Sequence, residues 1–168
     1  MKNKKAYFIT EAAIIAAIYV VLTLAINAIN LASGAIQVRL SESLTILPYF
    51  TSAAVPGLTI GCLISNLIAG ASGVMNIFDV IFGSLATLLG ALGSYALRKH
   101  KWLVPLPPII ANTLIIPWIL HLAYGIPGGI PFFMMTVGIG EILSCGVLGI
   151  ALLTILQKYR NVIWKNIP

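Results

Sequence analysis

Residues 37–57, QVRLSESLTILPYFTSAAVPG, decide how the chain folds. They place two charged residues, Arg39 and Glu42, directly before an apolar run, and they end in Pro56-Gly57. Proline followed by glycine favours a turn between helices. The stretch therefore predicts two short helices, over residues 42–55 and 57–70, with two charged groups at the mouth of the first.

The composition around this stretch is that of a membrane protein. Of the 168 residues, 60% are hydrophobic and 8% are charged, whereas about a quarter of the residues in a soluble domain are charged. So few charges cannot cover a water-facing surface, and runs of about 20 apolar residues are long enough to cross a bilayer. We expect an all-α membrane protein formed by a single integral membrane domain, residues 1–168.

The apolar runs predict six transmembrane helices. These cover approximately residues 6–31, 42–55, 57–70, 77–97, 103–123 and 130–157. The total is six only if Pro56-Gly57 is counted as a turn, and five otherwise. Six spans place the basic amino terminus, the basic loop at residues 98–101 and the basic tail on one side of the membrane, as the positive-inside rule requires. Both termini are therefore predicted to be cytoplasmic.

The net charge of +6 has the same origin and does not indicate a nucleic-acid partner, because the cations follow the ends of the apolar runs. The sequence shows no phosphate-binding glycine loop, no nucleophile with an evident base, and no metal-ligand spacing around Cys62 or Cys145. We expect neither an enzyme nor a protein that binds a metal or cofactor. The partners expected are the lipid bilayer and a small molecule.

In this topology most of the acidic residues gather on the outer side. The connection at residues 33–41 is extracellular, which places Arg39 and Glu42 at the outer mouth, and Asp79 opens the fourth helix from outside. Glu141 lies about ten residues into the last helix, or roughly 15 Å. An ionisable group inside a span costs several kcal/mol and normally faces a cavity or a partner. We therefore predict a pocket that is open to the outside.

Each of these charged residues also has a structural interpretation. Glu141 can make a hydrogen bond within the bundle, and Asp79 can stabilise the start of a helix capped by Asn76. Arg39 and Glu42 can form an interfacial ion pair, which is worth about 0–1 kcal/mol when it is exposed.

The uncharged candidates are equally open to two interpretations. Asn66 and Asn112 can bind a ligand or join two helices, and Trp118 can stack on a ring or anchor the chain at the membrane interface. In the first span, two pairs of small residues are spaced four apart, which permits close helix approach. These pairs, which can serve a partner or the bundle itself, are Ala12/Ala16 and Ala13/Ala17.

Several stretches resemble the QueT family, whose members are substrate-binding (S) components of energy-coupling factor (ECF) transporters for queuosine precursors. The resemblance covers nearly the whole chain. It is carried by residues 38–45 (VRLSESLT), 47–50 (LPYF), 54–57 (AVPG), 61–66 (GCLISN), 79–87 (DVIFGSLAT), 107–112 (PPIIAN) and 138–141 (GIGE).

This resemblance implies a six-helix bundle in the bacterial cytoplasmic membrane, with the ligand bound near the outer face. It also implies a transmembrane coupling protein and two cytoplasmic ATPases as partners, so that ATP is used by other subunits and no cofactor belongs to this chain. The four alanines of the first span match the docking motif expected for that module.

The substrate class implied is a 7-deazaguanine such as preQ0, preQ1 or queuine. Its guanine-like edge presents a ring N–H and an amine, which a carboxylate such as that of Glu141 can accept. Asn112 or Asn66 can donate to the ring oxo group, and Asp79 or Glu42 can pair with an aminomethyl cation.

Two further roles complete this hypothesis. The planar ring can stack on Tyr49, Phe50 or Trp118, and Arg39 with Glu42 can form a latch that holds the outer loop over the pocket. The main alternative is a stand-alone, proton-coupled transporter of a nucleobase or vitamin-like compound. A lipid-modifying enzyme and a passive channel rank below it, since catalytic groups are too few and the inner half is too apolar.

Overall fold

The chain is described by a computed structural model, which covers residues 4–28, 39–71, 73, 76–125 and 127–164. The regular structure in these residues is entirely helical, which confirms the predicted class. The elements are α1 (Lys4–Ala28), the 3-10 helix η1 (Leu40–Tyr49), α2 (Ala54–Ala71), the π-helix η2 (Asp79–Gly83), α3 (Ser84–Ala96), α4 (Leu106–Leu122), α5 (Ile130–Glu141), the π-helix η3 (Ile142–Leu148) and α6 (Gly149–Ile163).

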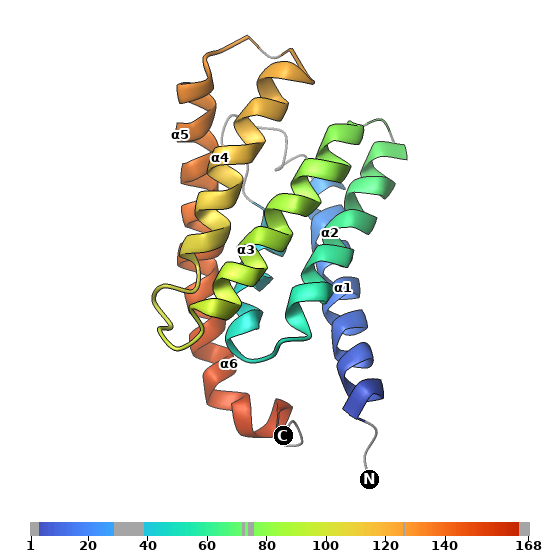
Figure 1. Cartoon of the computed structure of the whole chain (residues 1–168), viewed down its shortest axis with the longest axis vertical. Helices are drawn as coiled ribbons and strands as arrows, with labels where there is room; N and C mark the ends of the chain where they lie inside the picture. The colour runs from blue at the N-terminus through green and yellow to red at the C-terminus, as the bar shows by residue number, and fades with distance from the viewer. Residues whose placement is uncertain (1–3, 29–38, 72, 74–75, 126, 165–168) are drawn as a thin grey trace.

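The helices form a bundle in which successive elements lie side by side (Figure 1). The segment α1 packs along α2, α2 against α3, α3 against α4, and α4 against α5. Two of the rods are composite, because η2 continues into α3 and α5 continues through η3 into α6. The start of α1 and the end of α6 lie at the same end of the bundle.

Four helices are long and apolar enough to cross a membrane: Lys4–Ala28, Ala54–Ala71, Asp79–Ala96 and Ile130–Ile163. The helix α4 is apolar but shorter. These helices make the chain a multi-pass membrane protein. The expectation of six full spans is not confirmed, because the predicted span 42–55 is largely the ten-residue η1. At about 2.0 Å per residue, η1 is too short for a hydrocarbon core of about 30 Å.

The segment η1 lies inside the bundle and contacts α1, α2, α3, η3 and α6. Its residues from Ser41 to Pro48 are all buried. A polar backbone in a 3-10 conformation is tolerated at membrane depth only where protein surrounds it. The position of η1 therefore explains why a charged residue, Glu42, can be carried into the interior of so apolar a chain.

The predicted helix break at Pro56-Gly57 was wrong. Both residues lie in the first turn of α2, and the break falls earlier, at residues 50–53. Proline is tolerated in the first turn because its missing N–H would have no helical partner there. Gly57 permits close packing instead, since a Cβ at this position would lie 2.8 Å from the Ala12 carbonyl oxygen.

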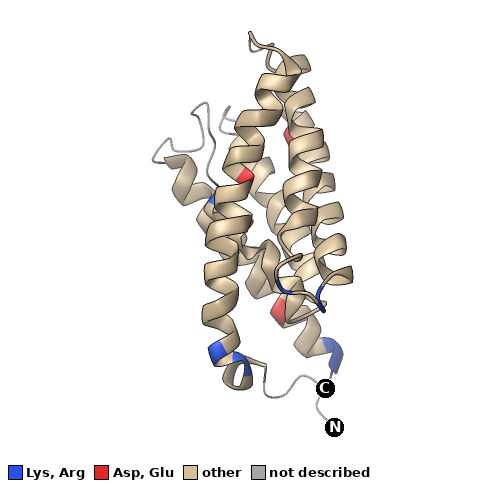
Figure 2. Cartoon of the chain, turned by 90° about the vertical axis from the view of Figure 1, so that its left-hand side faces the viewer, with Lys and Arg blue, Asp and Glu red and all other residues tan. Residues whose placement is uncertain are grey.

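Most of the described basic residues gather where α1 begins and α6 ends (Figure 2). We call this the basic end; its residues are Lys4, Lys5, Arg98, Lys99, Lys101, Lys158 and Arg160. The positive-inside rule predicts that it faces the cytoplasm, and this orientation stays a prediction. Residues 29–38, which include most of the predicted outer loop, lie outside the described residues.

Candidate functional site

Two carboxylic acids meet in the interior of the bundle. Glu42 is the third residue of η1, Glu141 is the last residue of α5, and their exposed fractions are 1% and 6%. Carboxyl oxygens of both residues and the Cys145 sulfur lie within 4.8 Å of one another. Burying charged or polar groups is costly unless they are partnered, so the partners of these two acids decide how the site is interpreted.

Within the described residues, each carboxyl group accepts a hydrogen bond from a tyrosine or cysteine side chain, and both interact with the same amide. The Tyr19 hydroxyl donates to Oε1 of Glu42 at 2.5 Å. The Cys145 thiol donates to Oε2 of Glu141 at 3.2 Å. The Asn112 side chain, which is 3% exposed on α4, interacts with both carboxyl groups. Residues from α1, η1, α4, α5 and η3 thus converge on one place.

Arg39 supplies a positive charge to this place without forming an ion pair. Its guanidinium is within electrostatic reach of Glu42 and Glu141, and its backbone N–H donates to the Ser144 hydroxyl at 3.1 Å. Among the residues that the structure describes, no ion pair joins it to Glu42, so the predicted latch is not seen as a direct contact. We refer to Arg39, Glu42, Asn112 and Glu141 as the carboxyl cluster.

The carboxyl cluster contains polar atoms that have no protein partner. Oε2 of Glu42, Nδ2 of Asn112 and the neighbouring Ser41 hydroxyl are buried, and they make no hydrogen bond within the described part of the chain. Leaving such an atom unsatisfied costs about 1–3 kcal/mol, and buried polar atoms in native proteins are nearly always paired. A small polar ligand that donates to Oε2 of Glu42 and accepts from Nδ2 of Asn112 would satisfy both atoms.

The helices widen at the acidic residues. Glu141 is followed directly by the π-helix η3, and Asp79 is the first residue of the π-helix η2. Segments of π-helix are uncommon and occur frequently at functional sites. No residue pattern in the sequence predicted either of them.

Most of the chain matches a known protein family. A family model described as QueT transporter matches residues 9–158. The chain belongs to the QueT transporter family. The resemblance found in the sequence is thereby confirmed. No solved structure matched the chain.

One relative of this QueT family member is the protein named Queuosine precursor transporter QueT from Lactococcus lactis subsp. cremoris strain MG1363. The two chains are 39% identical over 89 residues, a match that covers 53% of this chain and 50% of the relative. The match thus spans half the length of the relative.

The hydrogen-bond partners of the Asp79 carboxylate lie at the start of η2 and in the segment after α4, and among the described residues none of them belongs to the carboxyl cluster. The Asp79 carboxylate accepts hydrogen bonds from the Asn76 N–H at 3.0 Å and from the Tyr124 hydroxyl, and Asn76 Oδ1 accepts from the Phe78 N–H. This reciprocal pattern is that of a capping box, so the structural interpretation of Asp79 is confirmed. Burial and the adjacent carboxylate raise the pKa of Tyr124 to about 12.

Asn66 also has a structural partner in this region. Its amide nitrogen donates to the backbone carbonyl of Asp79 at 2.9 Å, and it contacts the Cys62 sulfur at 3.4 Å. The residue therefore joins α2 to the start of η2. A ligand contact by Asn66 or Asp79 stays a prediction.

Tyr49 and Phe50 do not lie near the carboxyl cluster as the stacking hypothesis required. They end η1 at the basic end, where the Tyr49 hydroxyl accepts a hydrogen bond from Gln157. Phe50 stacks on Trp164 with ring centroids 4.5 Å apart. The seven residues from Glu42 to Tyr49 advance about 14 Å in a 3-10 helix, and this length separates the rings from the acids.

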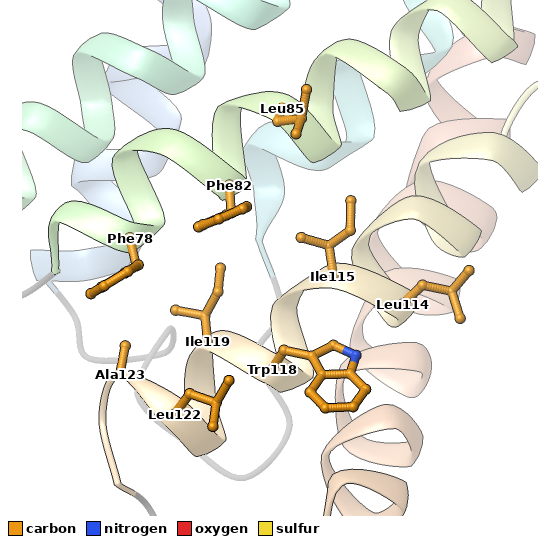
Figure 3. Close-up of a pocket in the computed structure, with 9 residues that line it drawn as sticks. All are labelled: Phe78, Phe82, Leu85, Leu114, Ile115, Trp118, Ile119, Leu122 and Ala123. Carbon is orange, nitrogen blue, oxygen red and sulfur yellow. The ribbon is translucent and has the colours of Figure 1, made fainter.

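Trp118 faces outward rather than toward the acids. Its side chain is half exposed and lines an apolar groove between α3 and α4 (Figure 3). The lining includes Phe78, Phe82 and Leu122. This environment fits the interpretation of Trp118 as a residue on the membrane-facing surface, and it does not place the indole ring where a ligand of the carboxyl cluster would stack.

The four alanines of α1 divide into two faces. Ala12 and Ala16 are buried against α2, where a Cβ at Gly61 would lie 3.0 Å from the Ala16 carbonyl oxygen. These two residues therefore serve packing within the chain and are not free to dock a partner. Ala13 and Ala17 are exposed, so the docking hypothesis is left with one pair.

A metal ion is the other species that such a cluster can hold. Among the described residues, Glu42, Glu141 and Cys145 form a group with suitable spacing. The set mixes two hard oxygen ligands with one soft sulfur, and the nearby Arg39 adds a positive charge that repels a cation. The prediction that the chain holds no metal stays untested.

Sequence reasoning missed Tyr19. It is 1% exposed and lies within an apolar run, where a tyrosine is typical of packing or of an interface position. A buried tyrosine hydroxyl usually requires a partner, so its depth in the span was the available signal. Cys145 was assigned to packing alone, although its thiol contacts Glu141.

Proposed function

We propose that the chain is the substrate-binding component of an ECF-type importer, and that it binds a 7-deazaguanine queuosine precursor at the carboxyl cluster. The observation that carries this proposal is the pair of unpartnered atoms, Oε2 of Glu42 and Nδ2 of Asn112, beside a second buried acid, Glu141. Membership of the QueT family supports the substrate class.

The chemistry of a 7-deazaguanine complements this set of groups. Its edge presents an exocyclic amine, a ring N–H and an oxo group in a row, which amounts to two donors followed by an acceptor. The two carboxyl groups accept from the donors, and the Asn112 amide donates to the oxo group. Hydrogen bonds to charged groups are worth about 1.5–3 kcal/mol each, so these contacts are strong enough to select the ligand.

Energy for uptake then comes from a partner module with a transmembrane coupling protein and two cytoplasmic ATPases. Two features support this part of the proposal. The sequence has no phosphate-binding glycine loop of its own, and α1 keeps one exposed pair of small residues, Ala13 and Ala17. Such a pair permits the close approach of another helix.

Calorimetric titration of the purified chain tests the proposal. The ligands are preQ0, preQ1, queuine and the nucleoside queuosine, with guanine as the comparison. We expect submicromolar binding of one of the four and its loss in Glu141→Gln, while Glu11→Gln, at the basic end, serves as the matched control that keeps binding. Absence of binding by all four, or full affinity in Glu141→Gln, would contradict the proposal.

A stand-alone proton-coupled transporter is the second candidate, because the buried acids Glu42 and Glu141 can exchange protons. Reconstitution distinguishes the two. Uptake of the ligand into liposomes that contain this chain alone, driven by a pH gradient, supports proton coupling. Uptake that requires the ATPase module and ATP supports the ECF assignment.

A further inference from the structure

Tyr19 is held rigidly at the seam between α1 and α2. Its side chain is 1% exposed, and the backbone of α2 approaches it so closely that a Cβ at Gly61 would lie 2.8 Å from the Tyr19 Cβ. Such an approach restricts the base of the Tyr19 side chain in a packed interior. The hydroxyl at its far end is directed at Glu42.

The Tyr19 hydroxyl forms a hydrogen bond with one of the two carboxyl oxygens of Glu42. It donates its only proton to Oε1 at 2.5 Å. Oε2, in contrast, is buried and has no partner within the described residues. Within these residues, Oε2 is therefore the oxygen of Glu42 that is left wholly to a ligand.

The side chains of Glu42 and Asn112 interact with each other. Oε2 of Glu42 and Nδ2 of Asn112 nevertheless complete no hydrogen bond in the described part of the chain. Together they present an acceptor next to a donor. The complementary ligand edge has a donor next to an acceptor, as in a ring N–H adjacent to a ring C=O, which is a lactam.

We propose that Tyr19 is a positioning residue that makes the carboxyl cluster selective for a lactam edge. It fixes the Glu42 carboxyl group so that Oε2 accepts a hydrogen bond from the ring N–H, while the Asn112 amide donates to the adjacent C=O. This inference rests on the proposed function and deepens it. Glu141 is then left to accept from the exocyclic amine. A 6-amino ring reverses the polarity of this edge, presenting a ring nitrogen acceptor beside an amine donor, and is rejected.

Two probes measure the selectivity directly: 7-deazaguanine, which has the lactam, and 2,6-diamino-7-deazapurine, which has the reversed edge. The variant Tyr19→Phe removes the hydroxyl and keeps the ring. We expect it to lower the ratio of the two affinities about tenfold, as the loss of one hydrogen bond to a charged group would. The matched control Tyr7→Phe, on an exposed residue of the same helix, is expected to leave the ratio unchanged.

A rescue experiment separates positioning from packing. In Glu42→Gln, the Tyr19 hydroxyl holds the amide oxygen and points the amide nitrogen at the ligand N–H, so binding of 7-deazaguanine falls about a hundredfold. In the double variant Tyr19→Phe/Glu42→Gln the amide is free to flip, and about tenfold of the affinity returns. A purely structural tyrosine would make the double variant bind no better than the single one.

The outcomes decide between the two proposals. If wild type binds neither the probes nor any of the four precursors, the proposed function fails. If wild type binds 7-deazaguanine but Tyr19→Phe keeps the affinity ratio, or if Tyr19→Phe brings no recovery to Glu42→Gln, only the role of Tyr19 fails. Thermal unfolding of each variant accompanies the titrations, and loss of folding in both Tyr19 variants would also overturn the proposal, since it would make the residue structural.

Discussion

Two glutamates in this chain are held in different ways. At the basic end, both carboxylate oxygens of Glu11 are used: Trp164 Nε1 donates to Oε1 at 2.6 Å, and the Thr51 hydroxyl donates to Oε2 at 2.9 Å. In the interior, Tyr19 occupies one oxygen of Glu42, and the other has no partner among the described residues. Glu11 thus has the partners of a structural joint, whereas Glu42 keeps an oxygen that we propose a ligand contacts.

The surroundings of the two acids support this distinction. Glu11 ties the start of the chain to the segment after η1 and to the end of α6, and the adjacent stack of Phe50 on Trp164 adds apolar contact to the joint. Glu42 lies instead beside a second acid and an amide that also lacks a partner. An unsatisfied buried group lowers stability, and the ligand that we propose would offset this cost at Glu42.

The largest effect is expected from Asn112→Leu, which replaces an amide whose Nδ2 makes no hydrogen bond among the described residues by an apolar group of similar size. We expect ligand affinity to fall about a hundredfold, and the melting temperature to stay constant or rise, because an unsatisfied buried donor has been removed. Titration and thermal unfolding of the same preparation check both. A clear fall in melting temperature would show that Asn112 is a structural residue like Glu11 and would break the comparison.

The reverse result is expected from Glu11→Gln, whose amide nitrogen cannot accept one of the two hydrogen bonds. We expect the melting temperature to fall by about 5 °C, from the loss of one hydrogen bond to a charged group, with ligand affinity unchanged. In Trp164→Phe the stack on Phe50 is kept and only the indole donor is lost, so a smaller fall is expected. Weaker ligand binding in both variants would mean that the two regions are coupled.

The smallest effect concerns the third carboxylate, that of Asp79, and tests a pH dependence. The pKa of Tyr124 is raised from its ordinary value of 10.0 to about 12, so folding favours the neutral hydroxyl. The stability it contributes is complete below about pH 10 and is lost as the pH rises toward about 12. Tyr124→Phe should therefore unfold at a slightly lower temperature than wild type at neutral pH, and the difference should shrink at high pH. A difference that grows with pH would contradict this assignment.

Much of the architecture could be predicted because it depends on apolar length and on helix-start chemistry. Long apolar runs identify membrane helices by the thickness of the bilayer alone, and the pairing of Asn76 with Asp79 follows from their spacing. The sequence also singled out Glu42, Asn112 and Glu141, since polar residues in apolar runs are costly. The fold brings these three together, and their contact with a ligand stays a prediction.

The remaining features depend on packing that no local pattern contains. A Pro-Gly pair is compatible both with a turn between helices and with the first turn of a helix. For Pro56-Gly57, only the contact between Gly57 and Ala12 distinguishes the two. The 3-10 conformation of η1 carries Phe50 away from Glu42 along its length. Tyr19 could not be assigned to Glu42 because its partner is 23 residues away in the chain.

The wide turns of η3 make the last rod sensitive to the loss of one residue. A π-helical segment holds more residues per turn than an α-helix, and successive residues of an α-helix are rotated by about 100°. Deleting one residue within Ile142–Leu148 would let the wide turns close into regular α-helix, which changes the side chains presented next to Glu141 while α6 continues the same rod. When relatives are aligned, a single-residue gap in this segment should therefore be treated as a local change beside Glu141 and not as neutral variation in length.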